Sequence, residues 1–125
     1  MVSAATVAGA SHIDHTDEVT RGGASGAGST AFGPSGLVYV TGVQLSWAFT
    51  TVTLSSGVSF SITVTDSAGN TFAEVEIGNG RTGNGSLSVP YPDDGVQTTG
   101  QFNLTVTGSF TSLIGPMAAV VGYRQ

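Results

Sequence analysis

The histidines and carboxylates near the N-terminus come closest, in this sequence, to the residue types and spacing of a chemical site. His12 and His15 form a His-x-x-His pair, and Asp14, Asp17 and Glu18 lie beside them. Imidazole nitrogens and carboxylate oxygens are ligands of zinc and similar ions. A metal site also needs a rigid shell to orient its ligands, and this cluster precedes a weakly structured, glycine-rich stretch. We therefore interpret it as a polar segment that faces a partner, with a pH-sensitive contact through the two histidines as the alternative.

Two groups of turn oxygens could in principle bind calcium. Asp66 and Asn70 flank a short turn, and Asp93 and Asp94 precede Gly95. Calcium takes six to eight oxygens, and neither group supplies enough by itself. Asp, Asn and Gly are also the residues that turns require for local reasons. We interpret both groups as turns and predict no metal and no cofactor.

Signatures of catalysis are missing from the sequence. It has no Gly-x-Ser-x-Gly elbow, no cysteine and no lysine, so the common serine, cysteine and P-loop chemistries are excluded. A carboxylate pair of the glycosidase kind could draw on Glu74 and Glu76, but both alternate outward on one expected strand. We predict that the protein is not an enzyme.

Charge and composition narrow the partners further. The 125 residues carry a net charge of −5, and only 9% are charged, against about 25% in typical domains. A nucleic acid or an anionic membrane surface is therefore disfavoured as a partner. Mean hydropathy is nevertheless positive, +0.22, which favours a surface covered by other subunits, because interface cores are depleted of charge. The N-terminus lacks the pattern of a secretory signal, so we expect synthesis in a host cytoplasm.

Composition divides the chain near residue 36. The stretch 22–29 is built from Gly, Ala and Ser, which cannot form a core by themselves. The Gly33–Pro34–Ser35–Gly36 sequence breaks regular structure after it. We predict an extended arm over 1–36 and one folded domain over 37–125.

From residue 37 onward the hydrophobic period is two, as in β-strands. The expected inward residues comprise Leu37, Tyr39, Val43, Leu45, Trp47 and Phe49, then Val58, Phe60, Ile62 and Val64, then Ala73, Val75 and Ile77, then Leu87, Val89 and Tyr91, and finally Phe102, Leu104 and Val106. Thr41–Gly42 predicts a bulge or bend, residues 66–70 predict a hairpin turn, and Pro90 predicts an edge strand. A last apolar run covers 117–123. Even strand spacing without helical periodicity predicts an all-β, antiparallel sandwich of the jelly-roll kind.

Phe72 stands out because it shares the outward parity of Glu74 and Glu76. An exposed phenylalanine would be an interface anchor or a ligand platform. The threonines of 63–65 and 105–107 would also lie on an outer sheet face, where β-propensity alone accounts for them.

In overall character the sequence resembles the small β-sandwich accessory proteins of tailed-phage particles, such as decoration or cement proteins and short head or tail subunits. The likeness rests on the small-residue arm over 1–36, the Ser/Thr-alternating strands over 58–64 and 102–106, and the missing catalytic motifs. It implies a virion location, a trimer or other symmetric oligomer, and binding to a major capsid or other virion protein by arm and sandwich surface. The residues expected to contact partners are His12, Asp14, His15, Phe32, Phe72, Leu113, Ile114 and Met117.

A second hypothesis from a different class remains open: a carbohydrate-binding or adhesin-like module. Its site would be formed by the glycine-rich loop over 78–85 and the loop over 92–100. Saturable binding to a glycan, abolished by loop mutations, would distinguish it from a structural subunit.

Overall fold

Seven β-strands make up the fold in a computed structural model that describes residues 14–21, 28–49, 60–77, 83–92, 94–108 and 116–125. The strands are β1 (Asp14–Arg21), β2 (Gly28–Phe49), β3 (Phe60–Thr65), β4 (Thr71–Ile77), β5 (Gly83–Pro90), β6 (Val96–Gly108) and β7 (Met117–Arg124). All the pairings between them are antiparallel.

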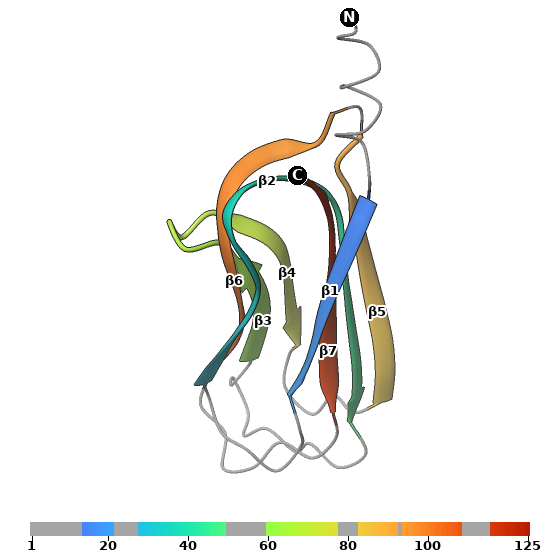
Figure 1. The fold of residues 1–125 in the computed structure, drawn as a ribbon. Coiled ribbons are helices and arrows are strands. Elements are labelled where there is room, and N and C mark those ends of the chain that lie inside the picture. The colour runs from blue at the N-terminus through green and yellow to red at the C-terminus, as the bar shows by residue number, and fades with distance from the viewer. Residues whose placement is uncertain (1–13, 22–27, 50–59, 78–82, 93, 109–115) are drawn as a thin grey trace, which may run out of the picture.

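The strands form two layers that share β2 (Figure 1). The C-terminal half of β2 pairs with β7 on one side and β5 on the other, and β1 pairs with β7. We call this layer, β1-β7-β2-β5, the first sheet. The N-terminal half of β2 pairs with β6, which pairs with β3, which pairs with β4; this is the second sheet. Two four-stranded antiparallel layers that face each other form a β-sandwich of the jelly-roll kind, so the predicted all-β fold is confirmed.

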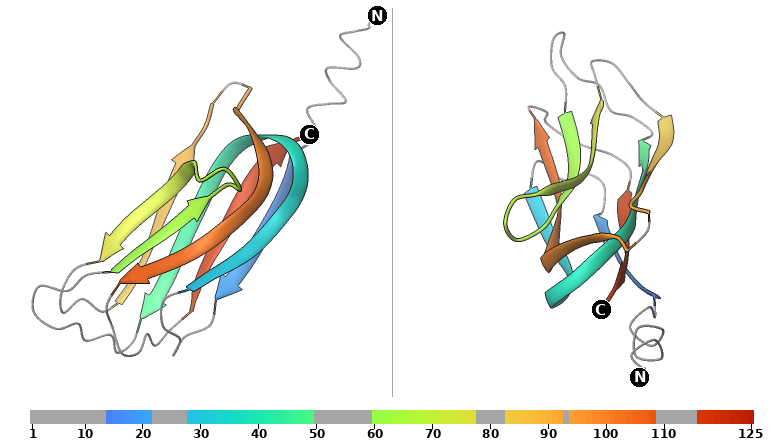
Figure 2. Two further views of the ribbon diagram at one scale, coloured as in Figure 1. Left: turned by 90° about the vertical axis from the view of Figure 1, so that its left-hand side faces the viewer. Right: turned by 90° about the horizontal axis from the view of Figure 1, so that it is seen from above.

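Two irregularities interrupt the long strand β2, which runs through both sheets (Figure 2). Its register shifts between Phe32 and Gly36 against β6, and again between Val40 and Gly42 against β7. A bulge bends a strand and increases its local twist. The bend predicted at Thr41–Gly42 is therefore confirmed, whereas the predicted break at 33–36 is a bulge through which the strand continues.

The bulge at Thr41 also reverses the predicted orientation of Leu37. Upstream of it Val38 and Val40 are buried, and downstream of it Val43 and Leu45 are buried. Because one extra residue reverses the alternation, Leu37 points outward and is 54% exposed, contrary to prediction.

The core lies between the two layers and is built from the inward face of each. It consists of Phe32, Val38, Val40, Val43, Leu45, Ile62, Val64, Phe72, Ala73, Phe102, Leu104, Val106, Met117, Ala119, Val121 and Tyr123. The prediction that Ile62 and Val64 of β3 and Phe102, Leu104 and Val106 of β6 point inward is confirmed. Pro90 lies in β5, whose described pairing is with β2 alone, as the predicted edge position requires.

The structure describes two strands within the stretch 1–36 that the sequence predicts as an arm. Residues 14–21 form β1, which pairs along its whole length with β7, and residues 28–36 form the start of β2. Backbone ladder bonds do not depend on bulky side chains, so a segment of small residues can still complete a sheet. Residues 1–13 and 22–27 lie outside the described residues.

Candidate interaction surface

The outward face of the first sheet is a nearly uncharged surface made by four strands in register. Its cross-strand rows are Thr16–Gly122–Gly42–Pro90, Glu18–Val120–Gln44–Ser88 and Thr20–Ala118–Ser46–Ser86. Among these twelve positions Glu18 alone is charged, and it lies on β1 beside β7. Charged side chains normally deter sheet faces and edges from associating. The positions of this face on β7, β2 and β5 carry no charge.

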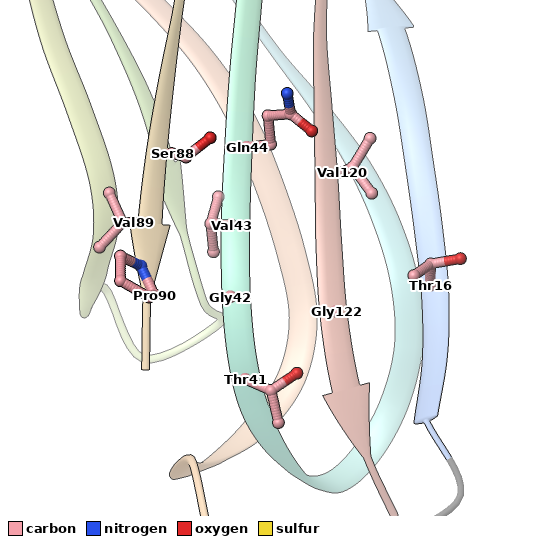
Figure 3. Close-up of a pocket in the computed structure, with 10 residues that line it drawn as sticks. All are labelled: Thr16, Thr41, Gly42, Val43, Gln44, Ser88, Val89, Pro90, Val120 and Gly122. Atoms are coloured by element: carbon pink, nitrogen blue, oxygen red, sulfur yellow. The ribbon is translucent and has the colours of Figure 1, made fainter. Parts of the chain in front are cut away.

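A groove of about 420 Å³ crosses this face where the strands carry glycine. Gly42 and Gly122 are cross-strand partners and form its floor. Figure 3 shows Thr16 and Pro90 on the flanking strands, with Gln44 and Val120 bordering the glycines. No charged residue lines the groove among the described residues. A second, smaller hollow of about 250 Å³ lies farther along the same face, bordered by Thr20, Ser46, Ala48 and Ala118.

Asp66 anchors the β3–β4 turn to the second sheet. Its carboxylate accepts hydrogen bonds from the backbone N–H of Ala68 at 2.9 Å and of Asn70 at 2.8 Å, from the Asn70 side-chain amide at 2.9 Å, and from the hydroxyl of Thr98. Burial by itself raises the pKa of Asp66, but these hydrogen bonds outweigh it, and the pKa lies below its ordinary value. Because these donors are all supplied from within the fold, the carboxylate has a structural role, and the predicted turn at 66–70 is confirmed.

A polar cluster joins β1 to β7. The hydroxyl of Tyr123 donates to Oδ2 of Asp17 at 2.8 Å. The ring of His15 stacks on Tyr123, its cross-strand partner, with centroids 5.4 Å apart. Burial first, and the Asp17 carboxylate second, raise the pKa of Tyr123 to about 12. The protonated hydroxyl of Tyr123 therefore acts as a hydrogen-bond donor that holds β1 against β7.

The N-terminal His and carboxylate cluster is divided by strand alternation. His15 and Asp17 lie on the side of Tyr123, whereas Glu18 is exposed on the outer face of the first sheet. Asp14 begins β1, and His12 lies outside the described residues. Within the described ranges, no group of three or more His, Cys, Asp or Glu side chains could hold a metal ion.

The prediction that Phe72 is an exposed interface anchor is wrong, because its side chain is buried. It is 5% exposed and packs edge-on against Tyr91 and Phe102. The β3–β4 register shifts from Val64↔Ala73 to Thr65↔Thr71, which leaves Phe72 as the extra residue of a bulge. Phe72 and Ala73 therefore both point inward. Simple alternation with Glu74 and Glu76 predicted an outward Phe72 because it did not include this bulge.

Phe32 and Met117, also expected to contact partners, belong to the core as well. Phe32 is 7% exposed and lies beside Phe102, with ring centroids 5.9 Å apart, while Met117 is 1% exposed. Leu113 and Ile114 lie outside the described residues. Of the residues predicted to contact partners, His15 remains partly exposed. The surface that sequence reasoning missed is the outer face of the first sheet, because its small residues gave no apolar signal.

The loops expected to bind a glycan are described only in part. Residues 83–85 belong to β5 and 96–100 to β6, while 78–82 and 93 lie outside the described residues.

The outer face of the second sheet carries the predicted threonines, with Thr63 opposite Thr105 and Glu74 exposed beside them. In the described part of the chain, no helix is long and apolar enough to cross a membrane.

Comparison with known proteins identifies relatives of the fold. Neither a protein-family model nor a curated protein matches the sequence. A chain of the cyanophage Pam1 capsid asymmetric unit is 16% identical, with a TM-score of 0.56 over 90% of this chain and 83% of that one. A chain of the Bacillus endospore appendages, described as a novel family of disulfide-linked pili, is 12% identical, with a TM-score of 0.50 over 89% of this chain and 88% of that one. The protein thus shares its β-sandwich fold, over most of its length, with a chain from a virus capsid and a chain from a pilus.

Proposed function

We propose that this protein is a non-enzymatic structural subunit of a virus particle, and specifically a decoration protein that packs on a capsid lattice. The observation that carries the proposal is the outer face of the first sheet. Strands β7, β2 and β5 present nine positions on this face without a charge, and a groove crosses them. A sheet face without charge is a poor surface for a freely dissolved protein and a suitable one for packing against other subunits.

Two further observations support this proposal. The fold neighbours come from assembled structures, a capsid and a pilus. The chain has no cysteine, so the disulfide linkage named for the pili is not open to it, which favours the capsid as the closer functional analogue. Many weak contacts on one lattice add by multivalency, so each contact need not be strong.

Residues 1–13 belong to the predicted arm and precede β1, the first described strand. We propose that they contact a neighbouring capsid subunit, together with the outer face of the first sheet. An extended segment loses conformational entropy on binding but can cover a large area.

Quantitative mass spectrometry of gradient-purified virus particles tests the proposal. We expect the chain to migrate with the major capsid protein at a fixed stoichiometric ratio. Recovery of the chain entirely in the fractions without particles would refute the virion role.

Binding of the recombinant chain to particles depleted of it then tests the surfaces. Val120→Lys places a charge at the centre of the outer face and should abolish binding, and removal of residues 1–13 should weaken it. Thr63→Lys, on the outer face of the second sheet, is the matched control and should bind normally.

A further inference from the structure

Strand β5 has an open side at the margin of the first sheet (Figure 1). Tyr91, the residue after β5, donates its backbone N–H to the carbonyl of Thr41 in β2 at 3.0 Å. Backbone groups along an antiparallel strand face alternate sides, so Leu87 also directs its N–H and C=O toward β2. Ser86 and Ser88 therefore direct theirs to the open side. In the described part of the chain, β5 pairs with β2 alone, so no strand meets those groups.

The other sheet edges carry features that oppose pairing with a further strand. Four of the eight residues of β1 are charged, two of the seven residues of β4 are glutamates, and the bulge of β2 contains Pro34. Charges, prolines and bulges all protect edge strands from pairing. None of the eight residues of β5 is charged, and its one proline is the last residue, Pro90. Among the described strands, β5 is thus the edge best suited to another strand.

The sequence of β5 fits an antiparallel partner identical to itself. Ser86 and Ser88 flank Leu87 symmetrically, so a two-fold axis at Leu87 sets Ser86 of one copy opposite Ser88 of the other. Both serines have outward backbone groups, so each of these two pairs exchanges two hydrogen bonds. Pro90 then falls opposite Asn84, where its carbonyl accepts the N–H of Asn84. The N–H that proline lacks therefore lies at the end of the ladder, where its absence costs least.

The side chain of Leu87 gives this register an apolar centre. Leu87 packs against the core but is only partly buried. On the two-fold axis it lies opposite its own copy, in a non-hydrogen-bonded pair with Cα atoms about 4.5 Å apart. Side chains in such a pair contact each other. Pairing therefore removes from water an apolar surface that a single copy leaves exposed.

We propose that two copies of this chain associate through β5 as a two-fold dimer, in which their first sheets join into one continuous antiparallel sheet. A two-fold interface uses the same patch on both subunits, and the symmetric Ser–Leu–Ser sequence of residues 86–88 supplies that patch. The contact lies at the edge of the first sheet, so it leaves the outer face of that sheet to the capsid lattice. The proposal goes beyond the virion role and does not rest on it.

Charge reversal across the two-fold axis tests the contact in the full-length chain. Leu87→Lys and Leu87→Glu each set two like charges opposite one another in the dimer. Each variant alone should self-associate at least about 10-fold more weakly than wild type. A mixture of the two sets opposite charges across the axis and should restore association as a heterodimer. Light scattering at several concentrations, with one variant enlarged by a fusion tag, resolves the heterodimer by mass.

The matched control is Val19→Lys. Val19 is also a partly buried apolar residue of an edge strand, β1, at the opposite margin of the first sheet. This variant should dimerise as wild type does. Circular dichroism and thermal unfolding establish that each variant is folded.

Disulfide trapping determines the register without adding charge, because the chain has no cysteine of its own. Ser86→Cys mixed with Ser88→Cys should give a mixed disulfide, since a hydrogen-bonded pair has Cα atoms about 5.5 Å apart and a disulfide needs them within about 7 Å. Ser86→Cys alone should give much less, because its two copies are offset by two residues, about 6.8 Å along the strands, as well as across them. Thr20→Cys, on β1, mixed with Ser88→Cys measures random collision.

Two results would overturn the proposal. One is a mixture of folded Leu87→Lys and Leu87→Glu that stays monomeric while wild type and Val19→Lys associate. The other is trapping of Ser86→Cys with Ser88→Cys that does not exceed the collision control, and this result decides alone if a Leu87 variant fails to fold.

Particle binding keeps this proposal separate from the virion role. Val120→Lys, which should abolish decoration, should still dimerise, because Val120 lies on β7 and away from the β5 edge. Decoration by a chain that fails both dimer tests leaves the virion role standing. Dimer formation without decoration leaves the β5 contact standing.

Discussion

The hydroxyl of Thr98 donates a hydrogen bond to Oδ2 of Asp66, which is 32 residues away in sequence and on the turn that follows β3. Asp66 is 2% exposed and Thr98 is 7% exposed, so this bond joins β6 to the β3–β4 hairpin inside the molecule. A hydrogen bond to a buried charge contributes more than one between neutral groups.

Asp66→Ala should destabilise the fold by about 3 kcal/mol, because it leaves Thr98 and two backbone N–H groups without their acceptor. Urea unfolding measures the loss. Ser67→Ala removes an exposed hydrogen bond to the carbonyl of Thr99, 3.0 Å long, from the same turn, and should cost less than about 1 kcal/mol. Equal losses in the two variants would contradict the special role of Asp66.

Asp66 should also make the fold sensitive to acid. Its pKa in the folded chain is below the ordinary value of 3.8, so below that value the unfolded chain binds more protons than the folded one. The stabilisation is complete above about pH 5 and is lost as pH falls through the lowered pKa. We expect Asp66→Asn to be less stable than wild type at pH 7 but to show a flatter decline as the pH falls below about 4. A decline as steep as that of wild type would assign the acid sensitivity to other carboxylates.

Tyr123 predicts the opposite behaviour at high pH. Its folded pKa is raised to about 12 from 10.0, so the folded chain retains the phenolic proton longer than the unfolded chain. The contribution is complete below pH 10 and is lost as pH rises from about 10 to 12. Tyr123→Phe should flatten the alkaline decline in unfolding free energy. A residual slope should remain from Tyr91, whose pKa burial also raises, and should disappear in the double variant with Tyr91→Phe.

Phe72→Ala should be among the most damaging single changes. It removes a ring that packs against Tyr91 and Phe102 in the core, and phenylalanine-to-alanine changes in cores cost about 3–5 kcal/mol. Glu76→Ala, at an exposed position four residues on, should stay within about 0.5 kcal/mol of wild type. Guanidinium unfolding compares them, and a small effect of Phe72→Ala on stability would return this residue to the surface role that alternation predicted.

Two glycines in the bulge of β2 between Phe32 and Gly36 distinguish the cost of backbone strain from the cost of a steric clash. Gly33 and Gly36 both have positive φ, 87° and 96°. A Cβ atom at Gly33 would lie 2.7 Å from Cδ2 of Phe102, whereas a Cβ atom at Gly36 would have no described atom within 4 Å apart from its chain neighbours. Alanine at either position should cost about 1–2 kcal/mol for the backbone alone, and Gly33→Ala should cost clearly more. Equal thermal shifts would mean that Phe102 moves aside freely.

The sequence alone determined the class of fold and the elements whose faces are set locally. Alternation identified β3 and the buried side of β6, because Ile62, Val64, Leu104 and their neighbours lie in stretches without a bulge. The turn residues 66–70 located the hairpin, and Pro90 located an edge, because each acts through its own backbone chemistry.

The tertiary structure decided everything that depends on an extra residue or a distant partner. A bulge at Thr41 turned Leu37 outward, and a bulge at Phe72 turned that ring inward, because one residue reverses every side chain beyond it. β1 carries no hydrophobic pattern of its own and is a strand because β7, about 100 residues later in the chain, pairs with it along its length. The groove likewise exists only because register brings Gly42 opposite Gly122, 80 positions away in the numbering.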